Sequence, residues 1–285
     1  DAVATISKVT DNIVAEAAPE VMRKYIPHAV DDKIFFPSSL EKIEQFKKES
    51  LPDSDQEKVI FFWNNRNARR KQSGTLIFWF KEWLDKNNLH DKAQLIMHTE
   101  PKDPHGQDLV HIVEHLELNN RQVLLSTQKI PPEHLAAMYN IADCTINISD
   151  AEGFGLATLE SLSCGTPIIV NMTGGLQEQV TNGKDWFGVG ILPSSKSVIG
   201  SQDVPYIYED RIDKGQFHSA LSKIYNVSAV ERRKMGMMGK QHVEENYNFK
   251  DFKESWISFI DKIVEEGGSW ETRKNYNGIR FMEVA

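Results

Sequence analysis

Cysteine is scarce in this sequence, since only Cys144 and Cys164 occur among 285 residues. Two cysteines so far apart form neither the dense framework of a small secreted domain nor the paired spacing of a zinc site. We therefore interpret both as small buried side chains in a reducing compartment, and we expect no disulfide and no cysteine-held metal.

Long hydrophobic runs are also lacking. No apolar stretch approaches the ~18–20 residues that a membrane-spanning helix needs, and no charged-then-apolar leader opens the chain. On these grounds we expect a cytoplasmic protein. The first residue is Asp1 and a strand-like run follows at once, so we interpret the sequence as a piece of a longer chain.

Basic residues are outnumbered, because 33 Lys and Arg against 41 Asp and Glu give a formal net charge of -8. A surface of that charge repels a polyanion as a whole, so nucleic acid is not an expected partner. A local basic pocket for a small anion is still compatible with this balance.

Short apolar runs alternate with amphipathic stretches along the chain. Helical patterns such as TLIFWFKEWLDKN and PEHLAAMYNIA separate the runs. This alternation predicts an α/β fold with a parallel sheet covered by helices on both faces. The strand-like runs are residues 2–7, 25–30, 58–63, 93–98, 122–126, 144–149, 166–171 and 189–193.

Glycine-containing turns follow two of these predicted strands, in SDAEGFG and in MTGG. Ligands of parallel sheets collect at the carboxyl ends of the strands, where such turns lead into helix N-termini that favour anions. Glycine also lets a phosphate or hydroxyl approach the backbone closely. A tight turn without any ligand is the plainer interpretation of each glycine taken alone.

Two glutamates flank the first of these turns, with seven residues between Glu152 and Glu160. Glu152 is placed to accept hydrogen bonds from hydroxyls above the turn, and Glu160 is placed in the next helix to accept from a ribose. A solvated helical carboxylate is the alternative for Glu160, and spacing alone does not separate the two interpretations.

A basic segment lies upstream of these turns in FFWNNRNARRKQSG, where Arg66 and Lys71 follow a predicted strand. If the strands are parallel, both cations lie at the same sheet end as the glycine turns and can neutralise a diphosphate. A solvated basic run or a nuclear-localisation-like patch are the alternatives. An Asp-x-Asp pattern at Asp53 and Asp55 falls in a polar connector, where we expect it to face solvent and not to bind a metal.

Four segments follow one another in a recognisable order: SKVTDNIV, IPHAVDDKIFFP, VIFFWNNRNARRKQ and HLAAMYNIADCTINISDAEGFGLATLESLSCGTPIIVNMTGGLQEQV. Taken in this order, they resemble the C-terminal, donor-binding half of retaining GT-B glycosyltransferases. The resemblance is to the glycosyltransferase family 4-like group, which includes sucrose synthases, bacterial mannosyltransferases and lipopolysaccharide glycosyltransferases. Its signature is the E-x7-E pattern from Glu152 to Glu160, and the similarity covers residues 1 to about 183.

This resemblance implies a Rossmann-like domain that binds a nucleotide-diphosphate sugar, and it assigns roles by position. Arg66 and Lys71 correspond to the basic pair on the diphosphate and Glu152 to the carboxylate near the donor sugar, which together form the implied catalytic set. Glu160 corresponds to the ribose ligand. The other implied donor-binding residues are Gly153, Phe154 and Gly155 at the sugar, Leu156 and Ala157 at the phosphates, and Thr127, Lys129 and Ile130 at the nucleobase.

The sequence also departs from the family pattern. Ala29 replaces a glycine of the usual PHGVD, the strand before Arg66 ends in WNN without a glycine, and residues 184–215 are longer than in the simplest members. The first two changes bear on hinge and phosphate-loop geometry, and the third on donor or acceptor choice. Neither the 184–215 segment nor STQKI contains an acidic residue uniquely placed to recognise the nucleobase. A GDP-hexose is therefore only slightly favoured over a UDP-sugar as the donor.

The resemblance divides the chain into three parts. Residues 1–37 correspond to the last β-α-β unit of the N-terminal domain with the crossover, 38–249 to the donor domain, and 250–285 to helices that cross back. We expect a metal-independent, retaining hexosyltransferase without a cofactor, whose acceptor is a glycan, lipid or protein. The expected partners include an N-terminal GT-B domain that makes any peripheral membrane contact. A sugar-nucleotide epimerase and a non-catalytic nucleotide-sugar-binding half are the alternatives.

Overall fold

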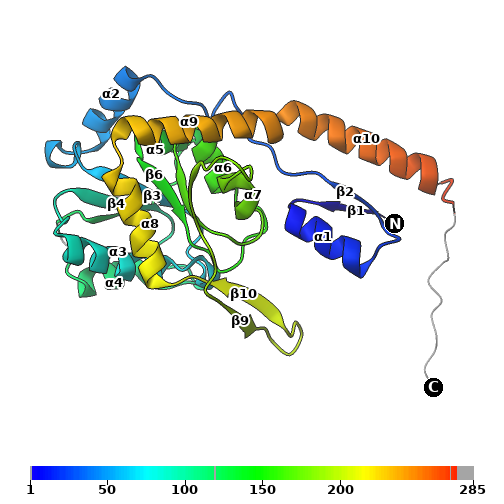
Figure 1. Cartoon of the computed structure of the whole chain (residues 1–285), viewed down its shortest axis with the longest axis horizontal. Coiled ribbons are helices and arrows are strands. Elements are labelled where there is room, and N and C mark those ends of the chain that lie inside the picture. The colour runs from blue at the N-terminus through cyan, green and yellow to red at the C-terminus, as the bar shows by residue number, and fades with distance from the viewer. Residues whose placement is uncertain (1, 119, 270, 275–285) are drawn as a thin grey trace.

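The computed structural model describes residues 2–118, 120–269 and 271–274, and its main feature is a six-stranded parallel sheet (Figure 1). The strand order is β5-β4-β3-β6-β7-β8, so the chain builds outward from β3 in one direction and then outward from β6 in the other. This is the Rossmann arrangement, and it confirms the predicted fold class. The strands are β3 (Val59–Asn64), β4 (Ala93–His98), β5 (Val123–Ser126), β6 (Cys144–Asn147), β7 (Ile168–Asn171) and β8 (Gly188–Ile191).

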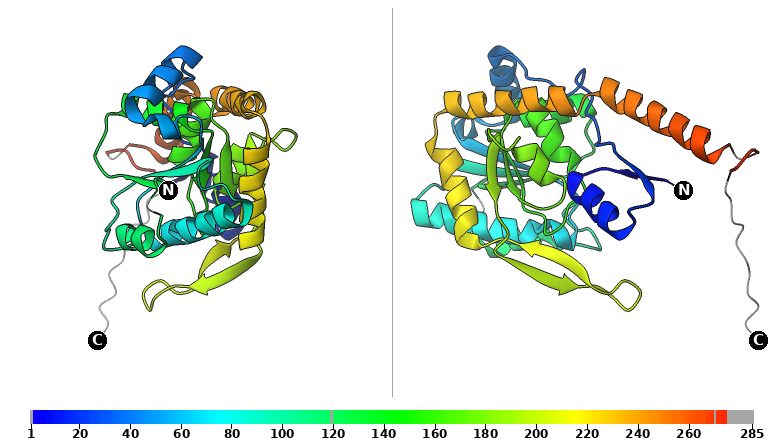
Figure 2. Two further views of the ribbon diagram at one scale, coloured as in Figure 1. Left: turned by 90° about the vertical axis from the view of Figure 1, so that its left-hand side faces the viewer. Right: turned by 45° about the vertical axis from the view of Figure 1, so that its right-hand side comes forward.

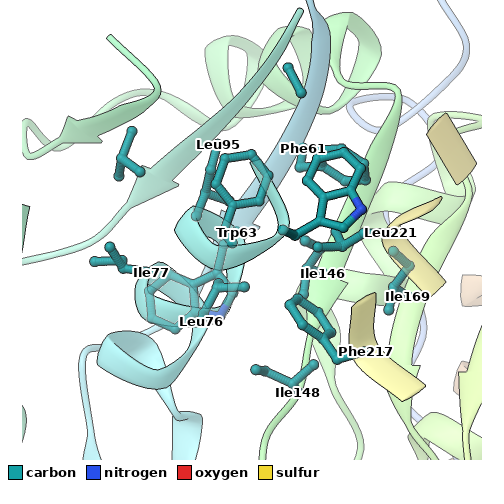
Figure 3. Packing of buried hydrophobic residues seen from close by; sticks show 14 of the residues in the cluster. Phe61, Trp63, Leu76, Ile77, Leu95, Ile146, Ile148, Ile169, Phe217 and Leu221 are labelled. Carbon is teal, nitrogen blue, oxygen red and sulfur yellow. The ribbon is translucent and has the colours of Figure 1, made fainter. Parts of the chain in front are cut away.

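Helices cover both faces of this sheet because its strands are apolar on both sides. Phe61 and Trp63 of β3 enter one hydrophobic core, and the alternating residues Ile60 and Phe62 enter the other. Figure 3 shows the first core, in which Trp63 packs near residues of α3. The first core lies under α3 (Ser73–Asn87), α4 (Leu109–His115) and α8 (Lys214–Asn226), and the second under α2 (Leu40–Ser50), α5 (Pro132–Ile141), α6 (Leu156–Ser163), α7 (Leu176–Val180) and α9 (Ala229–Asn246).

A separate β-α-β unit opens the described chain, formed by β1 (Ala2–Thr5), α1 (Lys8–Ala17) and β2 (Met22–Tyr25). The two strands are parallel, with Ala2 opposite Met22. The prediction of a strand at 25–30 was wrong, because β2 ends where that run begins. Pro27 has no amide hydrogen for a strand ladder, and the apolar Ile26 and Val30 are buried in the crossing segment instead.

Two long helices, α9 and α10, lie near the end of the described chain. A capping box between Ser228 and Glu231 begins α9, and Asn248 caps α10 (Phe249–Gly267). Figures 1 and 2 show α10 extending away from the large sheet, beside the β1-α1-β2 unit. Lys24 of β2 donates hydrogen bonds to the carbonyl oxygen of Ser255 at 3.2 Å and to Ser258 Oγ at 2.6 Å. The three-part domain division stays a prediction, and Trp270, Phe281 and the end of the 250–285 segment lie outside the described residues.

Cys144 and Cys164 are both buried and free, as predicted. Within the described residues, no helix combines the length and the apolar character that crossing a bilayer requires. The segment between residues 37 and 58 contains α2, none of whose residues is fully buried.

One antiparallel feature was not predicted from the sequence. The strands β9 (Ser195–Ile199) and β10 (Ile207–Arg211) pair with each other as a hairpin, with Ile207 opposite Ile199. The hairpin occupies the long 184–215 segment and protrudes from the body of the molecule (Figures 1 and 2). Its base lies next to the loops that follow β3 and β6, which are the subject of the next section.

Candidate functional site

The sheet changes its winding direction between β3 and β6, which are hydrogen-bonded neighbours. The chain leaves β3 toward one face of the sheet and leaves β6 toward the other face. The carboxyl ends of these two strands therefore border the crevice where Rossmann-like sheets bind ligands. The loop after β3 carries Arg66 and Lys71, and the loop after β6 carries Glu152. A backbone hydrogen bond of 2.8 Å from the Asp150 amide to the Arg70 carbonyl oxygen joins the two loops directly.

Lys71 and Glu152 form an ion pair in this crevice. Lys71 is 8% exposed, and burial lowers the pKa of its ammonium while the charge of Glu152 opposes that change. Arg70 Nη1 lies 3.7 Å from the same carboxylate and also donates to the Ala151 carbonyl oxygen. Two cations therefore converge on Glu152, so the loops carry more positive than negative charge at that point.

The two glycine turns interlock beneath Glu152. Gly174 has φ +49°, and a Cβ atom there would lie only 1.6 Å from the carbonyl oxygen of Glu152. The Gly175 amide donates to the Gly153 carbonyl oxygen at 3.2 Å. Glycine at 174 is thus required by close approach of the backbone, and the second turn supports the first.

The turn at 153–155 leads into α6 through Gly155, which has φ +95°. No side chain caps this helix, so the amides of its first turn, which include those of Leu156 and Ala157, point out of the helix end without a side-chain acceptor. Phe154 is only 3% exposed and anchors the turn in the core. A helix N-terminus of this kind, beside Lys71, favours an anion.

Glu160 lies on α6, within a short chain of hydrogen bonds. Tyr139 donates to Glu160 Oε2 at 2.8 Å, and Asn64 Nδ2 donates to the Tyr139 hydroxyl oxygen at 2.8 Å. Burial raises the pKa of Glu160 to about 7, and the hydrogen bond from Tyr139 offsets only part of that rise. The simple solvated-helix interpretation of Glu160 therefore does not hold.

Arg66 is not brought to Glu152. Its guanidinium forms a bidentate pair with Asp103, at 2.7 and 3.1 Å, and its side chain is 62% exposed. Asp103 follows β4, which is parallel to β3, so the carboxyl ends of both strands lie at the same end of the sheet. The loop after β3 and the loop after β4 meet there. Among the described residues, the cations in contact with Glu152 are Lys71 and Arg70, and the second was missed although it directly precedes Lys71 in the sequence.

The predicted nucleobase segment follows β5, at the edge of the sheet next to β4. Thr127 and Lys129 are exposed and Ile130 is half-buried. Because the strands are parallel, this segment lies at the same end of the sheet as the two central loops. Its role toward a base stays a prediction.

Of the two aspartates of the Asp-x-Asp pattern, Asp53 is exposed as expected, but the expectation that Asp55 faces solvent was wrong. Asp55 is fully buried and pairs with Lys58 at 2.8 Å and with Arg121 at 2.6 Å. Burial acts to raise the pKa of Asp55, but hydrogen bonds led by that from Arg121 outweigh it and lower the pKa to about 2. Asp53 and Asp55 precede β3, so they lie at the opposite end of the sheet from Glu152. Asp55 therefore has a structural role.

Comparison with known proteins agrees with this geometry. Residues 42–198 match the family described as glycosyl transferases group 1, which is more than half of the chain. D-inositol 3-phosphate glycosyltransferase of Corynebacterium jeikeium (strain K411) is 31% identical over 183 residues, which are 63% of this chain and 42% of that protein. The chain thus spans less than half the length of this curated relative.

Two solved structures show the same fold. Sucrose-phosphate synthase from Thermosynechococcus elongatus aligns with a TM-score of 0.72 and 21% identity, over 93% of this chain and 59% of that one. The C-terminal domain of a glycosyl transferase group 1 family protein (LpcC) from Francisella tularensis aligns with a TM-score of 0.57 and 19% identity. That alignment covers 77% of this chain and 99% of the solved domain.

Proposed function

Since this chain belongs to the glycosyl transferases group 1 family, we propose that it is the donor-binding half of a retaining hexosyltransferase. It would hold a nucleotide-diphosphate sugar while the hexose passes to an acceptor hydroxyl. The observation that supports this most strongly is the convergence of Lys71, Arg70 and the uncapped start of α6 on one crevice of the sheet. All three favour the negative charge of a diphosphate.

The donor has a distinct contact for each of its parts in this proposal. Lys71 and the Leu156 and Ala157 amides would neutralise the diphosphate, and Glu152 with the 153–155 turn would contact the sugar. Glu160 would accept hydrogen bonds from the ribose hydroxyls, in place of the one it now receives from Tyr139. Arg66 would join the diphosphate only after leaving Asp103.

The chemistry proposed for this site depends on positioning and charge. The leaving diphosphate would take the proton of the acceptor hydroxyl as the new bond forms on the same face of the sugar, which retains the anomeric configuration. The cations would stabilise the charge that grows on the leaving diphosphate. We propose that no metal takes part, and that the enzyme acts in the cytoplasm.

The nucleotide is the least constrained part of the proposal, with a GDP-hexose only slightly favoured over a UDP-sugar. A thermal-shift screen of UDP, GDP and ADP, each beside its nucleoside, tests the donor class. Stabilisation by at least one diphosphate beyond its nucleoside is expected. Stabilisation by none would contradict the proposed function, and stabilisation by UDP alone would replace the GDP preference.

The acceptor side requires a further domain in this proposal. The chain covers 42% of the inositol phosphate glycosyltransferase it matches, and the missing part would supply the acceptor site. The isolated chain should bind donor without transferring it, because the acceptor hydroxyl is not held near the anomeric carbon. Hexose transfer by the isolated chain would refute this half-enzyme account, and epimer formation from the donor would favour a sugar-nucleotide epimerase instead.

A further inference from the structure

Charged residues at its base tie the hairpin to both loops of the candidate site. Glu209 of β10 pairs with Arg69 at 2.6 Å, in the loop after β3. Arg211, two residues further along β10, pairs with Asp150 in the loop after β6. The hairpin therefore reaches the two loops that carry Lys71 and Glu152, through one charged residue each.

These contacts form one continuous series. Arg211 also binds Glu209 at 2.9 Å, and Gln72 donates to Asp150 from the loop after β3. We call this series the clamp: Arg69, Glu209, Arg211, Asp150 and Gln72. Its carboxylates are nearly inaccessible, with Glu209 at 2% and Asp150 at 3% exposure, so their charges depend on these partners.

Backbone hydrogen bonds run parallel to the clamp. The Asp210 amide donates to the Asp150 carbonyl oxygen at 2.8 Å, and Asn171 Nδ2 donates to the Asp210 carbonyl oxygen at 3.0 Å. The Asp150 amide in turn donates to the Arg70 carbonyl oxygen. Arg70 is thus the direct sequence neighbour of Arg69, and Glu152 lies two residues from Asp150, both of which the hairpin holds.

We propose that Glu209 and Arg211 are positioning residues for the diphosphate, which fix the spacing of the loops bearing Lys71 and Glu152. Neither residue contacts the diphosphate in this account. Arg211 keeps two buried carboxylates together, and Glu209 anchors Arg69, and with it the loop after β3, to the hairpin. Without Arg211, Glu209 and Asp150 would repel each other across the base of the hairpin and the loops would separate. This inference rests on the proposed function, because it assumes a diphosphate at Lys71.

The test compares binding of the diphosphate with binding of the nucleoside, in the 285-residue chain. Isothermal titration gives the dissociation constants of UDP, GDP, uridine and guanosine, and the diphosphate gain is the ratio of the nucleoside constant to the diphosphate constant. Glu209→Gln and Arg211→Gln should each lower this gain by about tenfold, which corresponds to losing one charge-assisted contact. Nucleoside binding should stay within about twofold, because the predicted base and ribose contacts lie on other elements.

Two matched variants separate positioning from general damage. Lys196→Gln removes a cation from the exposed side of the same hairpin and should leave the diphosphate gain unchanged. Arg211→Lys keeps the charge but loses the planar fork, so it should recover part of the gain that Arg211→Gln loses. It also provides a folded variant if Arg211→Gln does not fold.

Two results would overturn the inference while leaving the proposed function intact. One is a wild-type diphosphate gain that Glu209→Gln and the Arg211 variants leave unchanged. The other is an equal loss for nucleosides and diphosphates, which would indicate a structural role alone. A wild-type chain that binds neither UDP nor GDP more tightly than its nucleoside would overturn the inference and the proposed function together.

Discussion

Lys71 and Glu152 are 81 residues apart in sequence, and they meet as an ion pair where the sheet reverses its winding direction. Lys71 follows the first strand of the sheet in chain order and Glu152 follows the fourth. The pairing therefore depends on β3 and β6 being neighbours, and it places a lysine under partial desolvation beside an uncapped helix start. This relationship is the basis of the proposed diphosphate site.

Removing the negative partner of Arg66 should strengthen donor binding. In Asp103→Asn the guanidinium of Arg66 is released from its bidentate pair, so it becomes available to the diphosphate. Exposed pairs of this kind are weak, so breaking the pair costs little and UDP or GDP affinity should rise by up to about fivefold. Calorimetric titration of the variant beside wild type measures this change, and weaker binding would show that Asp103 itself orders the loop for the ligand.

Glu160 should distinguish ribose from deoxyribose. Glu160→Ala removes the proposed acceptor, so it should weaken a ribonucleoside diphosphate by about 1–2 kcal/mol more than its 2'-deoxy analogue. Glu57→Ala, an exposed carboxylate at the opposite end of the sheet, is the matched control. Competition binding with both nucleotides gives the comparison, and equal losses for the two sugars would mean that Glu160 has only a structural role.

The carboxyl group of Glu160 should also make the stability of the protein depend on pH. Folding raises the pKa of Glu160 from its usual 4.5 to about 7, so its stabilising contribution is complete below pH 4.5 and is lost as pH rises through 7. Glu160→Gln should therefore gain about 2–3 kcal/mol of unfolding free energy relative to wild type between pH 5 and pH 8. Urea unfolding at the two pH values tests this, and an identical difference at both would place the pKa of Glu160 near its usual value.

Asp55 should matter for stability and not for the ligand. Its stabilising contribution is present above the usual pKa of 3.8 and is lost as pH falls through about 2. Asp55→Asn should lower the unfolding free energy by about 3 kcal/mol, because Lys58 and Arg121 lose their buried partner. UDP and GDP affinity in EDTA should stay within about twofold of wild type. Affinity that instead depends on both Mn²⁺ and Asp55 would restore the Asp-x-Asp motif as a metal site.

The central sheet could be predicted because its strands are buried on both faces. Runs such as VIFFW are apolar throughout, and the turns after residues 149 and 171 contain the glycines that close backbone approach requires. The predicted boundaries of these strands therefore match the structure within two residues. The run at 25–30 was apolar for another reason, since Ile26 and Val30 fill a crossing segment.

Charged residues were harder to assign because their partners come from distant parts of the chain. Arg66 and Arg70 belong to the same loop, but Arg66 pairs with Asp103, which follows β4, while Arg70 reaches Glu152. Asp55 looked solvent-facing in a polar connector, but Arg121 arrives from a loop 66 residues away and buries it. The hairpin strands are short and largely exposed, so their pattern resembled an irregular insertion.

The most direct measurement of the central claim is calorimetric titration of the chain with UDP and GDP, for wild type and Lys71→Gln. Lys92→Gln, an exposed lysine at the opposite end of β4, carries the same charge change and serves as the control. We predict that wild type and the control bind at least one diphosphate equally, and that Lys71→Gln loses about 2–3 kcal/mol of binding while remaining folded. Unchanged affinity in the folded Lys71→Gln variant would contradict a diphosphate site at the Lys71–Glu152 pair.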